Sequence, residues 1–155
     1  SLRRDHLHIL ETGGWMGRTG ERFLREMPQD AELLVCELEP ERAQECITRL
    51  NKVVNYKRWV VVQGDILELL IRLPDHSVDF AFVDDNHNAE HVDHEVTLLM
   101  PKMTVGGIIC FHDVFGAYNL QRVVEKYGGY CLDLPALGSS GGLGIIQVRE
   151  STRDV

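Results

Sequence analysis

Several features that mark whole classes of protein are missing from this sequence. None of its four cysteines belongs to a C-x-x-C pair, so the spacing indicates no zinc or redox motif. No run approaches the roughly 20 apolar residues of a membrane span, and the start, SLRRDHLHIL, lacks the apolar core of a signal peptide. Positive charge is scarce: 24 acidic residues outnumber 16 lysines and arginines, so the formal net charge is −8. We therefore expect a cytoplasmic protein with neither a nucleic acid nor a membrane as partner.

Length and composition indicate a single globular domain over residues 1–155. A chain of 155 residues with 44% hydrophobic residues buries roughly two-thirds of its unfolded surface and needs no disulfide to fold. Cys36 and Cys110 lie inside apolar runs, where cysteine packs as a small hydrophobic residue. We expect free thiols in a reducing compartment.

Apolar runs of strand length alternate with helical patterns along the chain. The predicted strands are His6–Glu11, Leu33–Glu37, Trp59–Gln63, Val78–Asp84, Ile108–His112, Tyr130–Leu134 and Leu143–Val148. The predicted helices are Thr19–Met27, a segment that begins at Pro40 and continues to Val54, Ile66–Leu73, a segment with Val92, Val96, Leu99 and Met103 on its buried face, and Leu120–Tyr127. This alternation predicts βαβ units and a parallel sheet.

The strand sequences also indicate how the sheet is covered. The runs VDFAFVD and GGIICF lack polar alternation, as is typical of strands with helices on both faces. We therefore expect an α/β fold: a three-layer, Rossmann-like sandwich around a seven-stranded, mostly parallel sheet. The glycine-rich link Gly138–Gly144 is too short for a crossover helix, so the last strand should be antiparallel.

Acidic residues follow the first five predicted strands. They are Glu11, Glu37, Asp65, the pair Asp84 and Asp85, and Asp113. Ligands of open α/β sheets bind beyond the carboxyl ends of the strands. One such acid is commonplace, because aspartate also caps helices. Five together predict a sheet edge that binds hydroxyls, amines or cations.

The turn after the first strand, ILETGGWMGRTGERF, is the candidate ligand-binding loop. A Walker loop requires G-x-x-x-x-G-K-[ST], whereas Gly13 to Gly17 is one residue short and Arg18 replaces the lysine. A dinucleotide fingerprint requires a second glycine where Trp15 stands, although Glu37 lies at the right distance to bind a ribose. A nicotinamide-dependent oxidoreductase therefore stays open as an alternative.

A series of motifs runs from E-x-G-x-x-x-G through an acid after the second strand and Gly-Asp after the third to Asp after the fourth. The stretches that carry it are ILETGGWMGRTGERFLRE, LLVCELEPERAQE, VVVQGDILELLIRLPDHSVDFAFVDDNH and LMPKMTVGGIICFHDVF. This series resembles the class I S-adenosylmethionine-dependent methyltransferases. The histidine after the fourth strand and the His-Asp pair after the fifth are most similar to the small O-methyltransferase branch. Macrolide-sugar and catechol O-methyltransferases are related to it.

The resemblance implies that S-adenosylmethionine is the cofactor and that a small molecule is methylated on oxygen. It assigns cofactor binding to Glu11, Gly13, Gly14, Trp15, Gly17, Thr19, Glu37, Leu38, Gly64, Asp65, Ile66 and Asp84. Glu11 and Asp84 would hold the ammonium group, and the helix start near Thr19 would hold the carboxylate. Glu37 would bind the ribose hydroxyls, and Asp65 would bind the adenine amino group.

The same resemblance implies catalytic roles for His87, Asp84 and Asp113. Sugar O-methyltransferases use an aspartate after strand four and an acidic pair after strand five to hold magnesium, and a histidine three residues beyond the first aspartate as base. Asp84 and His87 keep that spacing, but His112 replaces one acid of the pair. A metal held by Asp84, His112 and Asp113 is therefore magnesium or an ion that accepts imidazole.

Other interpretations of these residues stay open. A methyltransferase fold that binds its cofactor without catalysis would keep the glycine turn and Glu37. Asp84 would then be only a helix cap, and His112 and Asp113 a structural pair. His91 and His94 point away from the predicted buried helix face, so we expect both to be solvated. We also expect a homodimer, in which a partner subunit covers the acceptor site.

Overall fold

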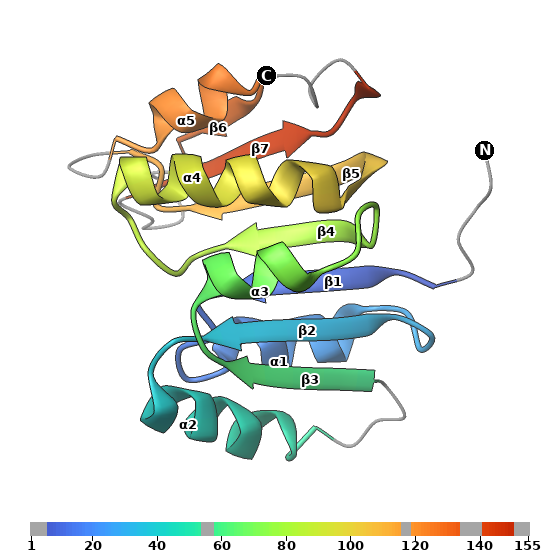
Figure 1. The fold of residues 1–155 in the computed structure, drawn as a ribbon. Helices are drawn as coiled ribbons and strands as arrows, with labels where there is room; N and C mark the ends of the chain where they lie inside the picture. Colours follow the sequence, from blue (N-terminus) through green and yellow to red (C-terminus); the bar gives the residue numbers. More distant parts are fainter. Residues whose placement is uncertain (1–5, 54–57, 116–118, 134–140, 151–155) are drawn as a thin grey trace.

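The computed structural model describes residues 6–53, 58–115, 119–133 and 141–150 (Figure 1). Its strands are β1 (His8–Thr12), β2 (Glu32–Glu37), β3 (Arg58–Gln63), β4 (Val78–Val83), β5 (Met103–His112), β6 (Tyr130–Leu132) and β7 (Leu143–Gln147). Its helices are α1 (Arg18–Glu26), α2 (Pro40–Leu50), α3 (Ile66–Arg72), α4 (Ala89–Leu99) and α5 (Gln121–Lys126), with a 3-10 turn η1 (Met100–Lys102). Within the described ranges, none of the helices has the length and apolar character that a membrane span requires.

The seven strands form one sheet in the order β3-β2-β1-β4-β5-β7-β6. The pairs from β3 to β5 are parallel, whereas β7 is antiparallel to both β5 and β6. The predicted α/β fold with a mostly parallel, seven-stranded sheet and an antiparallel last strand is therefore confirmed. Because β1 lies between β2 and β4, the chain reverses its direction of travel across the sheet there. Such a switch point opens a crevice at the carboxyl ends of the strands.

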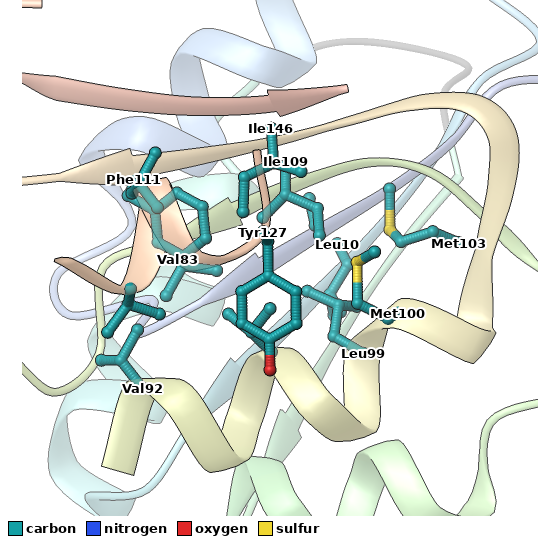
Figure 2. Packing of buried hydrophobic residues seen from close by; sticks show 14 of the residues in the cluster. Leu10, Val83, Val92, Leu99, Met100, Met103, Ile109, Phe111, Tyr127 and Ile146 are labelled. Atoms are coloured by element: carbon teal, nitrogen blue, oxygen red, sulfur yellow. The ribbon is translucent and has the colours of Figure 1, made fainter. Parts of the chain in front are cut away.

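Helices cover both faces of the sheet. α1 and α2 lie on one face, and α3, α4 and α5 lie on the other (Figure 1). The larger core packs α4 and α5 against β4, β5 and β7. Figure 2 shows Val92 of α4 toward Val83 and Phe111, and Leu99 toward Leu10. The smaller core packs Leu24 of α1 and Leu50 of α2 against β1 and β2. Fully burying each such side chain contributes about 1.5–3 kcal/mol.

Two segments differ from the prediction. The helix that was expected to include Met103 ends at Leu99, because the 3-10 turn Met100–Lys102, which contains Pro101, follows it and Met103 opens β5. Met103 is buried as expected, but from a strand (Figure 2). β5 begins five residues earlier than predicted. Gly106 adopts φ 87°, and the register against β4 shifts between Val78 and Phe80. The strand is therefore distorted at this point but does not end. Val54, Leu134 and residues 138–140 of the predicted link lie outside the described residues.

Candidate functional site

The turn after β1 is held against the ends of β2 and β4 by backbone contacts. The N–H groups of Gly13 and Gly14 both donate to the carbonyl of Cys36, over 3.0 and 3.1 Å. Gly13 has φ 78°, and a methyl group on it would lie 2.5 Å from the Cα of Asp85. Only glycine combines this conformation with so close a backbone approach. The turn therefore brings the carboxyl ends of three strands together.

A cavity of about 200 Å³ opens beside this turn, at the carboxyl ends of the strands. It is lined by Gly13, Trp15, Cys36, Glu37, Leu38, Glu39, Arg42, Gly64, Asp65, Ile66, Asp84, Asp85, Asn86 and His91. Larger hollows exist elsewhere, but the one of about 720 Å³ lies near the amino ends of β1 and β4. Its lining lacks the acidic strand ends. The chemistry therefore favours the smaller cavity as the ligand site.

Glu37 organises one wall of this cavity. Its side chain is buried, and its two oxygens accept hydrogen bonds from the backbone N–H groups of Trp15 (2.6 Å) and Glu39 (3.0 Å). Each carboxylate oxygen keeps a second lone pair for a ligand donor. Trp15 has φ 43° and a half-exposed ring, and the Arg42 guanidinium stacks 3.8 Å above that ring. The ring and the guanidinium together form a flat outer wall.

The predicted cofactor residues fall into two groups. Gly13, Trp15, Glu37, Leu38, Gly64, Asp65, Ile66 and Asp84 all line the cavity. Glu11, Gly14, Gly17 and Thr19 are not among its lining residues. Gly14 and Gly17 shape the turn, because the N–H of Gly17 donates to the carbonyl of Gly14 over 2.7 Å. Thr19 faces a different hollow, between α1 and α2.

Asp65 and Glu11 have structural roles that the sequence did not resolve. Asp65 caps α3, accepting a hydrogen bond from the N–H of Leu67 over 2.8 Å. Glu11 is buried at 1% exposure and points toward α1, where the backbone of Gly20 hydrogen-bonds its carboxyl. Burial, reinforced by the charge of Asp84, raises the pKa of Glu11 to about 8. A largely neutral carboxyl on that side of the sheet is poorly placed to hold an ammonium group in the cavity.

Four side chains gather beyond β4 and β5, as the sequence predicted. The Nδ1 atom of His112 lies 3.1 Å from Oδ1 of Asp84 and 3.4 Å from Oδ2 of Asp113. The Nε2 atom of His87 lies 3.6 Å from the same Asp84 oxygen and 3.8 Å from the same Asp113 oxygen. Two carboxylates thus face two imidazoles, an arrangement suited to proton transfer. We call these four residues the His–Asp group.

The surroundings of the His–Asp group change the acidity of Asp84 and fix the position of Asp113. Burial raises the pKa of Asp84, while His112 and His87 oppose that rise. Asp113 adopts φ 52°, and its backbone N–H donates to the carbonyl of Gly142 over 3.1 Å. Few residues other than glycine adopt such a φ, and when they do the site is often functional. The loop before β7 therefore fixes Asp113 in the position it needs to meet both imidazoles.

Sequence reasoning missed a second polar cluster beside the cavity, and its expectation for His91 was wrong. His91 is not solvated, because its Nε2 lies 3.3 Å from Oδ2 of Asp85 and only 27% of its side chain is exposed. It sits at the border of the buried face of α4, one turn before Glu95. Glu95 is completely buried. His94 is exposed, as expected.

The sequence contained only a weak indication that Glu95 belongs to a polar cluster. At ~100° per residue it falls beside Val92 and Val96 on the apolar face, where a carboxylate is unexpected. Burial, followed by the charge of Asp85, raises the pKa of Glu95 well above its usual range. The hydroxyl of Thr12, at the end of β1, opposes that rise. A glutamate on the apolar stripe of a helix is the feature that would have revealed this cluster.

Comparisons with known proteins agree with this geometry. Residues 10–114 match the sequence model of a family described as a methyltransferase domain. No curated protein matches the chain significantly. Three similar solved structures are a Klebsiella pneumoniae protein assigned as an O-methyltransferase (22% identity, TM-score 0.76), cofactor-bound Rv0187 from MTB (18%, 0.76), and the O-methyltransferase TomG from Streptomyces achromogenes in complex with SAM (19%, 0.73). Each comparison covers 92% of this chain and 73% of the other.

Proposed function

The chain belongs to the methyltransferase domain family, and on this premise we propose that it transfers a methyl group from S-adenosylmethionine to a hydroxyl of a small molecule. The observation that carries the proposal is the position of the His–Asp group directly beside the cavity: Asp84 belongs to both. A methyl donor held in the cavity and an acceptor held at the His–Asp group would meet at this residue.

The residues of the cavity fit the cofactor. The Cβ position of Gly64 has no atom within 4 Å, which leaves open space next to Asp65 and Ile66 for an adenine ring. Glu37 has the free lone pairs that two ribose hydroxyls need, and Trp15 with Arg42 closes the outer side. Near the close approach of Gly13, the Asp84 carboxylate offers a partner for the ammonium group. When bound, S-adenosylmethionine supplies an electrophilic methyl group on a sulfonium.

His87 is the general base of the proposed reaction. Its imidazole takes the proton from the acceptor hydroxyl, and its Nε2 lies 3.6 Å from an oxygen of Asp84 and 3.8 Å from one of Asp113. Both carboxylates face this nitrogen and orient the ring. Asp84 and Asp113 thus hold the base in position.

A divalent ion at the His–Asp group is a second possibility that the geometry admits. Ligand atoms of Asp84, His87 and His112 lie within 4.8 Å of one another, and Asp113 adjoins them. Asp84, His112 and Asp113 would hold the ion, which would supply positive charge for the acceptor oxygen. The imidazole suits an ion such as Mn²⁺ or Zn²⁺ better than magnesium. Activity that survives EDTA would exclude a metal requirement.

Calorimetric titration with S-adenosylhomocysteine, with NADH as a parallel control, tests cofactor binding. We expect micromolar binding of the first ligand, its loss in Glu37→Ala, and no binding of NADH. Binding of NADH alone would instead support the nicotinamide-dependent oxidoreductase. Absence of binding by either ligand would overturn the proposal.

Catalysis is tested with His87→Ala and the matched control His94→Ala, an exposed histidine on α4. Loss of a general base lowers kcat about 10²- to 10⁴-fold, so we expect that loss in His87→Ala, unchanged S-adenosylhomocysteine affinity, and wild-type kcat in His94→Ala. A panel of hydroxylated acceptors followed by mass spectrometry supplies the substrate. Tight cofactor binding without turnover of any acceptor would favour a non-catalytic binding module.

Single-domain organisation, a cytoplasmic location and a homodimer are further parts of the proposal. All four cysteines are free thiols, as is usual in a reducing compartment. Ile108, Tyr130 and Leu132 are exposed, and the strand register places them on the sheet face that carries α1 and α2. On this face α1 and α2 pack mainly on β1 to β3, and Phe23 of α1 also contacts Phe80 and Phe82 of β4. A second copy would cover this apolar face, and light scattering of the purified protein measures the dimer directly.

A further inference from the structure

Glu95 is the most unusual buried group in the described part of the protein. It has no solvent exposure, and neither oxygen of its carboxyl has a hydrogen bond of good geometry, although the Asp85 carboxyl and the Thr12 hydroxyl both lie against it. Oδ1 of Asp85 and Oγ1 of Thr12 are also buried without such a bond. A buried carboxylate is strongly unfavourable unless it is paired or binds a metal. The structure therefore places unused oxygen ligands around one point.

In the part of the chain that the structure describes, these oxygens lack a lysine or arginine partner. Within the described ranges, neither Asp85 nor Glu95 forms an ion pair with lysine or arginine; the pair between Asp85 and His91 is the only one at the cluster. One atom each from Asp85, His91 and Glu95 lies within 4.8 Å of the other two. Ligand atoms around a tetrahedral zinc ion, each about 2.0–2.2 Å from the metal, are separated by roughly 3.3–3.6 Å. The three side chains thus need only small rotamer shifts to surround one ion.

We propose that Asp85, His91 and Glu95 form a binding site for a divalent transition-metal ion of the zinc type, distinct from the His–Asp group. His91 and Glu95 stand one helical turn apart on α4, and Asp85 approaches from the end of β4. This is the common plan of two ligands on a helix and a third from elsewhere in the chain. One imidazole with two carboxylates suits Zn²⁺ or Mn²⁺, whereas Mg²⁺ and Ca²⁺ prefer oxygen alone.

The position of the cluster gives the ion an entry path and a consequence. Asp85 and His91 line the cavity proposed for the cofactor, whereas Glu95 lies deeper. An ion would therefore enter through the cavity and keep one coordination position directed toward it. By joining α4 to the end of β4, it would also fix the wall next to Asp84. The proposal does not rest on methyl transfer, since metal binding is measured without either substrate.

The rival explanation is a shared proton. A neutral Glu95 beside an ionised Asp85 would also relieve the buried charge, and it would need no ion. The two explanations differ in whether the purified protein takes up metal through these residues.

The test is calorimetric titration of the EDTA-treated, dialysed protein with Zn²⁺, in a His112→Ala background that disables the His–Asp group as a competing site. We expect one equivalent bound with micromolar or tighter affinity. Adding Glu95→Gln or His91→Ala should weaken it at least 100-fold, whereas adding His94→Ala should leave it unchanged. His91 is partly exposed, so His91→Ala tests the site even if the buried substitution prevents folding.

Substitution by Co²⁺ gives an independent readout of the ligands. We expect the visible absorption of tetrahedral or five-coordinate cobalt, lost in Glu95→Gln and His91→Ala. Failure to bind Zn²⁺ in the His112→Ala background, or affinity that is indifferent to Glu95→Gln and His91→Ala, would overturn the proposal and leave the shared proton. Binding of S-adenosylhomocysteine, measured separately, keeps this outcome distinct from failure of the proposed function.

Discussion

Substitution of Gly13 by alanine tests how the cofactor turn is built. Gly13 has φ 78°, and the added methyl group would lie 2.5 Å from the Cα of Asp85 and even nearer to the carbonyl oxygen of Asp84. The left-handed conformation alone costs a non-glycine residue about 1–2 kcal/mol. The overlap with rigid backbone adds the cost of overpacking, about 1–3 kcal/mol. We therefore expect Gly13→Ala to reduce the free energy of unfolding by about 2–5 kcal/mol.

Gly128→Ala is the matched control. Gly128 has a nearly identical φ of 72°, but no atom lies within 4 Å of its Cβ position. Gly128→Ala should therefore show only the conformational cost, about 1–2 kcal/mol. The difference between the two variants isolates the close approach between β1 and β4.

Urea denaturation followed by circular dichroism measures the two stabilities, and calorimetry with S-adenosylhomocysteine measures binding. Because the overlap displaces Asp84 from β1, Gly13→Ala should lose at least about tenfold in affinity, that is ~1.4 kcal/mol. Gly128→Ala should bind normally. Equal loss of stability in both variants, or normal binding by Gly13→Ala, would refute the argument that the close approach positions the site.

Three further predictions concern other parts of the structure. Because the folded pKa of Glu11 is about 8, above its ordinary 4.5, the protein should lose stability as pH rises between these values, by up to roughly 5 kcal/mol. Glu11→Gln should flatten this dependence in urea titrations at pH 5 and 8; parallel curves would contradict it. Asn88 caps α4 through the N–H groups of Glu90 and His91, so Asn88→Ala should destabilise by about 1 kcal/mol and Asn88→Asp should restore stability. Arg42→Ala removes the stack on Trp15 and should shift the tryptophan fluorescence maximum without changing the free energy of unfolding by more than about 1 kcal/mol.

Much of the fold could be predicted because local patterns carried it. The apolar run VDFAFVD gave β4, and Pro40 marked the start of α2. The exceptions were local as well: Gly106 bends β5 without ending it, and Pro101 ends α4 before Met103. Single glycines and prolines are ambiguous, because the same residue can end an element or distort it, and the neighbouring strand decides which occurs.

Only one of the two polar clusters at the candidate site could be predicted from the sequence. The sequence predicted that Asp84, His87, His112 and Asp113 would meet, because carboxyl ends of neighbouring parallel strands share one edge of the sheet. It did not predict that Asp85 and His91 would join Glu95. That cluster depends on how α4 rotates about its axis over β4, and a rotation of a few tens of degrees would turn His91 back to solvent.

The sequence by itself determined the order of strands and helices, the acidic edge of the sheet and the glycine turn. The tertiary structure decided which helices each strand side chain contacts on its face of the sheet. Glu11 and Thr12 are neighbours in β1, yet Glu11 points to α1 and Thr12 to Glu95 of α4. Successive residues of a strand necessarily point to opposite faces. Which of the two faces α4 covers follows from the crossover connections and from packing, and those involve residues far away along the chain.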